Sequence, residues 1–302
     1  MKSYARDDAD DRLEGFLRER LALPALTLRR LPVACISRIY RAEAAEGRPL
    51  FVKWGMVADG AAADFAAACA DEPLVPQNLF GSPFAFEGRP VFCQDWRAFE
   101  RVKIADMTDA RFRSFLDGYR RIFGRMQRFD RAAPAGTGEA WQEEIRAVAA
   151  RHTAVRTLLR GLLELGPEDL RRPSDARLAV VHGDFHSGNF GFDGERLSTV
   201  LDFDNFVRAY PIEDLAFAFA ESARQSALDW HPLRRARLRR RLRIAAAEWG
   251  RPADEWRFAF NLVRLVQAAK SLRRRPDSLR TALIVAARDR RMRGLIKVTE
   301  GR

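Results

Sequence analysis

The sequence predicts an α+β fold, with a small antiparallel sheet in the N-terminal part and a mainly helical C-terminal part. Short segments of strand-like alternation lie between residues 31 and 93 and are separated by turn residues. From residue 109 onward, apolar side chains recur at helical spacing instead. A chain of 302 residues can bury one large core or form two lobes. The change of pattern favours two lobes.

The N-terminal part begins with an amphipathic helix over residues 9–22, which Pro24 ends. Residues 31–44 and 50–54 then predict two strands joined by a turn at Glu46-Gly47. Further on, we expect an alanine-rich helix and a strand, over residues 61–70 and 90–93.

The C-terminal part is predicted to be helical with one interruption. Phe112, Phe115, Tyr119 and Met126 belong to an apolar stripe that we interpret as core. A long helix is expected over residues 141–165. After the interruption, helices are expected over residues 233–249, 256–269 and 279–296.

The composition indicates a reducing compartment. Cys35, Cys69 and Cys93 do not form a disulfide framework. Residues 1–14 are acidic after Arg6 and lack an apolar core, so they do not read as a signal peptide. No uncharged apolar run approaches the length of a membrane span. We therefore expect a cytoplasmic protein without a transmembrane segment.

The net charge of +12 is concentrated in the C-terminal quarter. Residues 231–302 contain 21 Lys and Arg against 6 Asp and Glu, whereas residues 1–230 contain 32 basic and 35 acidic groups. Such a cluster attracts anionic partners. No aromatic interleaving or nucleic-acid motif accompanies it, so we do not expect nucleic acid as a partner. A solvated arginine-rich surface is the simpler interpretation, and an anionic substrate or surface at residues 231–302 is the alternative.

The interruption carries the most informative motif of the chain. Residues 180–190 read Val-Val-His-Gly-Asp-Phe-His-Ser-Gly-Asn-Phe, and residues 201–204 read Leu-Asp-Phe-Asp. Asn189 stands five positions after Asp184, and Asp202 thirteen after Asn189. Phosphoryl transfer uses one carboxylate to orient the attacking hydroxyl, and an amide oxygen and a second carboxylate to hold Mg²⁺.

The local pattern explains how these groups come together. A strand ending at Val181 delivers Asp184 on a loop, and the turn residues Asp193-Gly194 reverse the chain. Residues 197–203 then return as a second short strand that carries Asp202.

At these residues the chain resembles the aminoglycoside phosphotransferase and choline kinase-like family, whose fold is related to that of the protein kinases. The resemblance implies a two-lobed fold, with a nucleotide-binding lobe at residues 1–95, a helical lobe at residues 96–302 and the site in a cleft between them. It also implies that Asp184 is the catalytic base and that Asn189 and Asp202 bind Mg²⁺. We expect ATP as the donor, with GTP as the alternative.

Lys53 ends an apolar strand, the position from which a kinase-like fold holds the α- and β-phosphates. The glycine-rich phosphate loop of the family is missing, because residues 34–38 contain no glycine. Ser37 could offer a hydroxyl and an N–H group to a phosphate instead. Gln94-Asp95-Trp96 is the expected connector, where backbone groups bind a nucleotide base.

Supporting roles are assigned to five further residues. Asp64 is a candidate for the acid that pairs with Lys53, with Asp71-Glu72 as the alternative. Asp214, or its neighbour Glu213, is expected to support the loop from a helix start. His186 either approaches the phosphates or braces the loop. The remaining supporting residues are His182 and Asp204.

The leading hypothesis is a Mg²⁺-dependent kinase that moves the ATP γ-phosphoryl group to a hydroxyl of a small molecule. Because the C-terminal part is basic, we favour a neutral or anionic acceptor, such as a sugar, an amino acid derivative or a glycolipid head group, over polycationic aminoglycosides. The missing glycines motivate an alternative, a kinase-like pseudoenzyme that binds acidic lipid or RNA through its basic helices.

Two other interpretations of the motif are weighed. In the first, Asp184 and Asp202 lie in polar turns and both histidines are structural. In the second, His182, Asp184, His186 and Asp202 bind zinc or iron in a metal hydrolase. The ordered spacing argues against the first, and Gly183 and Gly188 argue against the helix that a pair of histidines four apart would favour.

Overall fold

The computed structural model describes residues 6–31, 37–43, 49–55, 61–129, 133–134, 138–151, 153–171, 178–223, 232–274 and 278–301. The chain forms two compact units. The first contains Met1–Glu100 and Ser198–Asp204, and the second contains Arg101–Leu197 and Asn205–Arg302. The segment Ser198–Asp204 therefore belongs to the N-terminal unit, although most of its neighbours in the sequence do not. The functional division at residue 95 stays a prediction.

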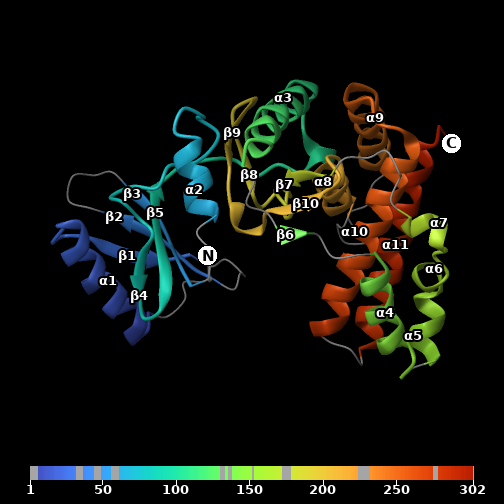
Figure 1. The fold of residues 1–302 in the computed structure, drawn as a ribbon, viewed down its shortest axis with the longest axis horizontal. Coiled ribbons are helices and arrows are strands. Elements are labelled where there is room, and N and C mark those ends of the chain that lie inside the picture. The colour runs from blue at the N-terminus through green and yellow to red at the C-terminus, as the bar shows by residue number, and fades with distance from the viewer. Residues whose placement is uncertain are drawn as a thin grey trace. The chain divides into compact units, whose positions relative to one another are not determined.

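The first unit is built on a five-stranded antiparallel sheet (Figure 1). Its spatial order is β1 (Thr27–Arg30), β2 (Arg38–Glu43), β3 (Pro49–Trp54), β5 (Arg89–Asp95) and β4 (Phe84–Phe86). Burial alternates along β3, where Leu50, Val52 and Trp54 are buried and the residues between them are half-buried. This alternation lets one face of the sheet enter the core while the other carries polar groups.

The helix α1 (Asp8–Leu21) covers the apolar face of this sheet. Leu13, Leu17 and Leu21 recur at helical spacing and pack with Tyr40 and Val52 of the strands. The short helix α2 (Ala61–Ala68) belongs to the same unit.

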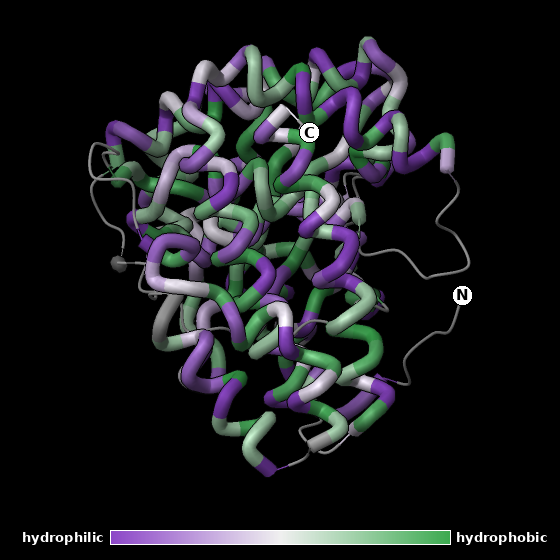
Figure 2. The backbone as a smooth tube through the Cα atoms, turned by 90° about the vertical axis from the view of Figure 1, so that its right-hand side faces the viewer, coloured by the Kyte–Doolittle hydropathy of each residue, from purple (hydrophilic) through white to green (hydrophobic). Residues whose placement is uncertain are grey.

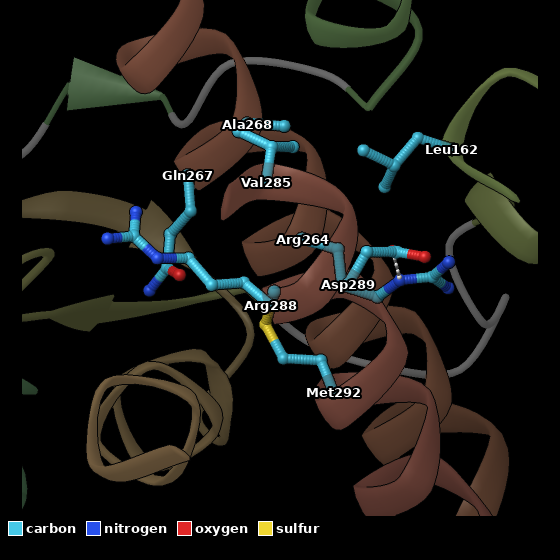
Figure 3. Close-up of a pocket in the computed structure, with 8 residues that line it drawn as sticks. All are labelled: Leu162, Arg264, Gln267, Ala268, Val285, Arg288, Asp289 and Met292. Carbon is cyan, nitrogen blue, oxygen red and sulfur yellow. Dashed lines mark hydrogen bonds and ion pairs between the residues drawn. The ribbon is translucent and has the colours of Figure 1, made fainter. Parts of the chain in front are cut away.

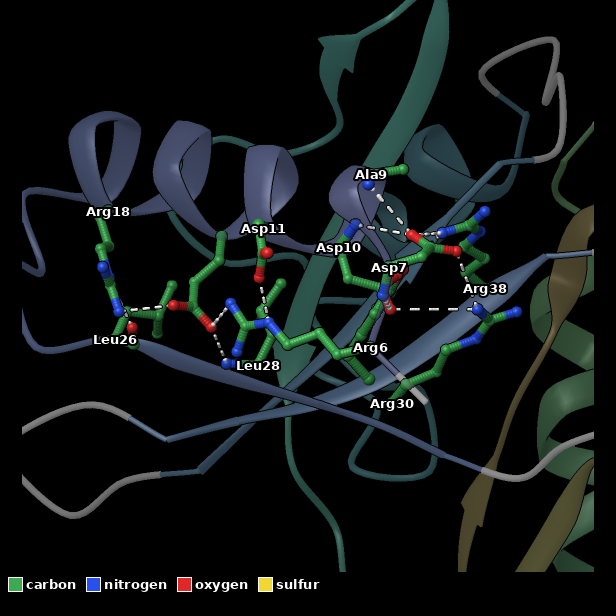
Figure 4. A network of polar contacts seen from close by, with 12 residues as sticks. Arg6, Asp7, Ala9, Asp10, Asp11, Arg18, Leu26, Leu28, Arg30 and Arg38 are labelled. Carbon is green, nitrogen blue, oxygen red and sulfur yellow. Dashed lines mark hydrogen bonds and ion pairs between the residues drawn. The ribbon is translucent and has the colours of Figure 1, made fainter. Parts of the chain in front are cut away.

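A polar network fixes the start of α1 against the strands (Figure 4). The Asp7 carboxylate accepts from the Ala9 and Asp10 amides at 3.1 and 3.0 Å, forming a capping box. Arg38 of β2 donates to Asp7 and Asp10 at 2.7 and 2.8 Å, and the buried Asp10 also accepts from the Tyr40 hydroxyl at 2.6 Å. The helix is thereby tied to the strand that neighbours β3.

The second unit is mainly helical. Its helices are α3 (Asp109–Met126), α4 (Gly138–Ala149), α5 (Thr153–Leu158), α6 (Arg160–Leu163), α7 (Pro167–Leu170), α8 (Glu213–Ala223), α9 (Pro232–Trp249), α10 (Ala253–Arg274) and α11 (Leu279–Thr299). Hydrophilic and hydrophobic segments alternate along the helices in Figure 2, as expected for elements with one buried side. None of the helices in the described ranges is long and apolar enough to cross a membrane.

The interruption between the helices contains short strands. β7 (Ala179–Val181) pairs with β10 (Val207–Ala209), which also pairs with β6 (Ala133–Pro134). β8 (Phe190–Asp193) and β9 (Arg196–Val200) form the predicted hairpin. The returning strand ends at Val200, earlier than the expected residue 203, and the chain then enters the short 3₁₀ helix Phe203–Asn205.

The prediction of one long helix over residues 141–165 is wrong, because the structure has three helices there. The chain folds back, so that the Gln142 amide of α4 donates to the carbonyls of Leu162 and Leu165 at 3.1 and 3.0 Å. Ile145 and Leu162 then share one core cluster, whereas a straight helix would separate them by about 25 Å. The break between the helices is therefore favoured, because it lets both apolar segments be buried in one core.

Two buried charges join α10 and α11 (Figure 3). Arg264 Nε lies 2.6 Å from Asp289 Oδ1, and the side chains are only 3% and 6% exposed. Arg264 also donates to Asn261 Oδ1 at 2.5 Å and to the Gly161 carbonyl at 3.1 Å. The ion pair is therefore completed by hydrogen bonds, which a buried pair requires.

Asp289→Ala is expected to lower the free energy of unfolding by about 3–5 kcal/mol, because it leaves a buried guanidinium without its carboxylate. Urea denaturation measures the change. Glu164→Ala is the control, since Glu164 pairs with Arg160 at the surface, and we expect no measurable loss there. Equal stability of the two variants would contradict this account of the α10–α11 contact.

Candidate active site

The loop between β7 and β8 carries Asp184, and Gly183 sets its path. Gly183 has a φ of +78°, and a Cβ atom there would lie 2.0 Å from the carbonyl oxygen of Asn205. The approach is so close because β10, which begins at Val207, pairs with β7 in a register that opposes Val207 and Val181. Only glycine satisfies both the backbone angle and the contact.

Gly183→Ala is expected to destabilise the protein by about 2 kcal/mol or more and to displace the loop, because strain at positive φ and the clash with Asn205 add. Gly194→Ala is the matched control. Gly194 has a φ of +55° but nothing within 4 Å of an added Cβ atom, so only the backbone strain of about 1 kcal/mol applies. Urea denaturation compares the variants, and equal losses would show that the contact with Asn205 does not matter.

Asp214 holds the start of the loop from the first turn of α8. Its carboxylate accepts from the amides of His182 and Gly183 at 2.7 and 2.9 Å, and from the Tyr119 hydroxyl at 2.9 Å. Asp214 is buried. Burial raises its pKa, although the charge of His182 and these hydrogen bonds oppose the rise. The second candidate, Glu213, accepts from the Tyr210 amide at 3.0 Å.

An aromatic anchor follows directly after Asp184. The ring of Phe185 is fully buried and lies 4.6 Å from the Tyr119 ring and 5.6 Å from the Phe115 ring. The predicted stripe of α3 is therefore core, and it holds the backbone next to Asp184.

The Asp184 carboxylate lies between two polar partners. Asn189 Nδ2 donates to the Asp184 carbonyl at 2.9 Å and to its Oδ2 at 3.3 Å. His186 Nε2 lies 3.4 Å from the same Oδ2. Burial acts to raise the pKa of Asp184, but the hydrogen bond from His186 and the charges of His186, His182 and Lys270 bring it below its ordinary value. The carboxylate is thus ionised at neutral pH.

The orientation of His186 follows from its other nitrogen. Its Nδ1 accepts from the Gly188 amide at 2.9 Å. In the neutral ring the proton therefore resides on Nε2, which faces Asp184. In this structure His186 braces the loop.

His186→Ala is expected to shift the acidic limb of the rate profile to higher pH. Without the hydrogen bond from His186, less offsets the effect of burial, so the pKa of Asp184 should rise. Once protonated, Asp184 cannot accept a further proton. In the wild type the lowered pKa of Asp184 should keep this group ionised to a pH below the ordinary range of an aspartate. The pH dependence of kcat/KM measures the shift, and a limb that does not move would contradict the assignment of His186.

The first unit carries a second cluster around Lys53. Because successive side chains of β3 point to opposite faces of the sheet, Lys53 lies on the side of the strand opposite Val52 and Trp54. Its Nζ lies 2.5 Å from Asp202 Oδ1 and also donates to Asp204 Oδ2. Burial acts to lower the pKa of Lys53, and the two carboxylates more than offset this, so its pKa is raised.

The segment that carries both carboxylates is fixed within the first unit. The Val200 amide donates to the Leu74 carbonyl at 2.7 Å, and the Phe203 ring lies 4.8 Å from the Phe65 ring of α2. Between these contacts Asp202 adopts a φ of +65°. This left-handed conformation is uncommon for residues other than glycine, but aspartate is enriched in it.

The other predicted nucleotide-binding residues lie in or near the sheet. Ser37 is buried, whereas residues 34–36 of the glycine-free segment lie outside the described residues. Gln94 donates to Asn78 Oδ1 at 3.0 Å, and the Trp96 amide donates to the Pro49 carbonyl at 3.3 Å. Asp95 is exposed.

Asp64 is exposed on α2. The carboxylates that raise the pKa of Lys53 are those of Asp202 and Asp204. The assignment of Asp64, Asp71 or Glu72 as an acid partner of Lys53 stays a prediction.

The oxygen atoms of these clusters suit a hard cation. Asn189 uses its Nδ2 on Asp184, so its Oδ1 is the atom suited to a metal. Carboxylate and amide oxygens are the ligands that Mg²⁺ prefers.

The histidines do not resemble zinc ligands, since the Nδ1 atoms of His182 and His186 accept from the amides of Asp184 and Gly188. Among the described ranges, no group of three or more His, Cys, Asp or Glu residues is arranged to hold a metal ion.

Three residues of the site were not identified from the sequence. Tyr119 was interpreted as core alone, yet its hydroxyl binds Asp214. Lys270 of α10 acts on Asp184 by its charge. The Asn205 carbonyl sets the position of Gly183. No local pattern marks these contacts, because each joins segments far apart in the sequence.

The small antiparallel sheet of the first unit and the helical majority of the second are those of the protein-kinase-like fold of phosphotransferases. The chain belongs to the phosphotransferase enzyme family (APH), whose family model matches residues 27–256. The chain matches none of the curated proteins.

Solved structures with similar folds cover nearly the whole chain. One is a thermostable mutant of aminoglycoside phosphotransferase APH(4)-Ia with ADP and hygromycin B, at 18% identity and a TM-score of 0.62, covering 95% of this chain and 98% of that one. A second is the amicoumacin kinase hAmiN with AMP-PNP, Ca²⁺ and Ami, at 13% identity and a TM-score of 0.59, covering 96% of each chain. A third is the macrolide 2′-phosphotransferase MphH of Brachybacterium faecium, at 16% identity and a TM-score of 0.58, covering 93% of this chain and 98% of that one. At these identities the likeness establishes the fold.

Proposed function

We propose that this protein is a Mg²⁺-dependent kinase that moves the γ-phosphoryl group of ATP to a hydroxyl group of a small molecule. The observation that carries the proposal is the geometry of the loop carboxylate of Asp184, which accepts from Asn189 Nδ2 at 3.3 Å and lies 3.4 Å from His186 Nε2. Membership of the phosphotransferase enzyme family supports it. We keep a cytoplasmic location as part of the proposal.

In the proposed reaction, Asp184 orients the acceptor hydroxyl and accepts its proton. The hydroxyl oxygen forms a bond to the γ-phosphorus, the bond from that phosphorus to the bridging oxygen breaks, and ADP leaves. Asn189 and Asp202 are the proposed metal ligands, Asp204 is a proposed supporting residue, and Lys53 is proposed to hold the α- and β-phosphates. When bound, Mg²⁺ neutralises the charge that develops on the phosphates.

Ser37 and the backbone of Gln94, Asp95 and Trp96 are the proposed contacts to the rest of the nucleotide. The Trp96 amide already donates within the sheet, so hydrogen bonds to the base fall to other backbone groups of this segment. His182 and Asp214 support the loop and take no part in the transfer.

We further propose that the acceptor is neutral or anionic. Lys270 places a positive charge close enough to Asp184 to lower its pKa, and residues 231–302 carry a large excess of basic groups. A polycation would be repelled by both. Sugars, amino acid derivatives such as homoserine, and glycolipid head groups satisfy this condition.

The experiment is an acceptor panel in which ATP-dependent formation of ADP is measured with and without each hydroxyl compound. We expect turnover with a neutral or anionic acceptor, and a rate lower by a factor on the order of 10³ in the Asp184→Asn variant. Efficient phosphorylation of cationic aminoglycosides, with no turnover of neutral or anionic compounds, would refute the proposed acceptor class.

The alternative of a pseudoenzyme that binds acidic lipid or RNA is motivated by the glycine-free segment. The comparisons give it no support. Salt-sensitive binding to acidic vesicles or RNA, without nucleotide turnover on the full panel, would favour it over the kinase.

A further inference from the structure

We propose that a pocket between α9 and α11 binds a small phosphorylated molecule through four arginines. The pocket has a volume of about 280 Å³. Its arginines are Arg235 and Arg239 of α9 and Arg290 and Arg291 of α11. This site is separate from the residues assigned to phosphoryl transfer, and the inference does not depend on the proposed function.

Gly294 brings two of the guanidinium groups together. A Cβ atom at Gly294 would lie 3.6 Å from Arg239 Nη2 and 3.8 Å from Arg235 Nη2. Both groups therefore reach the same point on the backbone of α11. Two cations at one point repel one another unless an anion lies between them.

The pocket lacks the acids that neutralise neighbouring arginines. On the same two helices, Arg234 pairs with Asp106, Arg240 with Asp109 and Arg293 with Asp289. Within the described ranges, in contrast, Arg235, Arg239 and Arg290 have no carboxylate partner. The remaining arginine, Arg291, donates to the Ala223 carbonyl at 3.2 Å. The lining contains no acidic residue.

Two of the four charges, those of Arg239 and Arg291, lie partly out of water, whereas Arg235 and Arg290 are exposed. Burial lowers the pKa of Arg239, and the charges of Arg235 and Arg243 lower it further. Burial likewise lowers the pKa of Arg291. A bound anion would reverse both effects, because it stabilises the charged forms.

The shape and the chemistry of the lining favour a phosphate ester. Guanidinium groups bind phosphate through two parallel hydrogen bonds, and four of them satisfy the oxygens of one or two phosphate groups. The volume lies near the lower end for small-molecule sites. Ala287 and Leu295 supply apolar lining between the arginines, so a compact organic phosphate fits better than a bare ion.

The test uses inorganic triphosphate as the probe, measured by isothermal titration calorimetry on the full chain at physiological ionic strength with EDTA present. We expect saturable binding of one molecule per chain. The Arg235→Gln/Arg239→Gln variant should bind about tenfold more weakly or worse, because two charge-assisted contacts are lost. The Arg156→Gln/Arg237→Gln variant removes the same charge from exposed positions outside the pocket and should bind like the wild type.

Three results would overturn the proposal. The first is equal loss of binding in both double variants, which would indicate a diffuse charge effect. The second is loss in Lys53→Met but not in Arg235→Gln/Arg239→Gln, which would place the probe at the nucleotide site. The third is binding to acidic vesicles or RNA without any binding of triphosphate, which would make this face a macromolecular surface. Circular dichroism confirms that each variant is folded.

Discussion

Asp184→Asn is expected to reduce the rate of ATP-dependent phosphorylation by a factor on the order of 10³, the middle of the range for loss of a general base. Asparagine has nearly the same shape but cannot accept the proton of the hydroxyl. The buried ring of Phe185 and the carboxylate of Asp214 still hold the loop. The expected loss of rate therefore lies in the chemical step, and we expect the fold and the affinity for nucleotide to be preserved.

Initial rates at saturating ATP and acceptor measure this change, and circular dichroism verifies the fold. Asp193→Asn is the control, because Asp193 is an exposed aspartate in the nearby β8–β9 hairpin, and its rate should equal that of the wild type. A rate for Asp184→Asn within about tenfold of the wild type would refute the assigned mechanism.

Asp202→Ala is expected to abolish the magnesium-dependent rise in thermal midpoint that ATP produces in the wild type. At a concentration of about 100 times Kd, a bound ligand adds about 2.7 kcal/mol to the free energy of unfolding. Removing Asp202 deletes a proposed metal ligand and one of the two carboxylates that neutralise Lys53. The nucleotide complex then loses most of this stabilisation.

Differential scanning fluorimetry with ATP, with Mg²⁺ and with both provides the measurement. Glu43→Gln, which removes an exposed carboxylate of the same unit, should respond like the wild type. A magnesium-dependent rise that persists in Asp202→Ala would show that Asp202 is not a metal ligand. No rise in the wild type would indicate that the glycine-free segment has removed nucleotide binding.

The fold was predicted where its signals are local. The period of two along β3 separates Lys53 from Val52 and Trp54, and the apolar period of α3 marks its buried side. The Asp193-Gly194 turn likewise marks the β8–β9 hairpin. Each of these patterns lies within one element, so the sequence alone identifies it.

Contacts between distant segments were not predictable in this way. The break in residues 141–165 depends on Gln142 meeting the carbonyls near Leu162. The placement of Asp202 in the N-terminal unit depends on Val200 meeting Leu74. Each of these contacts depends on which surfaces pack against one another in the folded chain. The spacing of residues along the sequence does not encode that choice.

The ion pairs of Lys53 have a consequence for the order in which ligands bind. Without nucleotide, the positive charge of Lys53 offsets one of the two negative charges of Asp202 and Asp204, with which it pairs. With the proposed roles of these residues, Mg²⁺ alone would compete with Lys53 for Asp202, and free ATP would compete with the two carboxylates for Lys53. The metal–nucleotide complex replaces both partners at once, so each ligand should raise the affinity for the other by the same factor. With these proposed roles, the internal ion pair would make the site selective for the complex over either component.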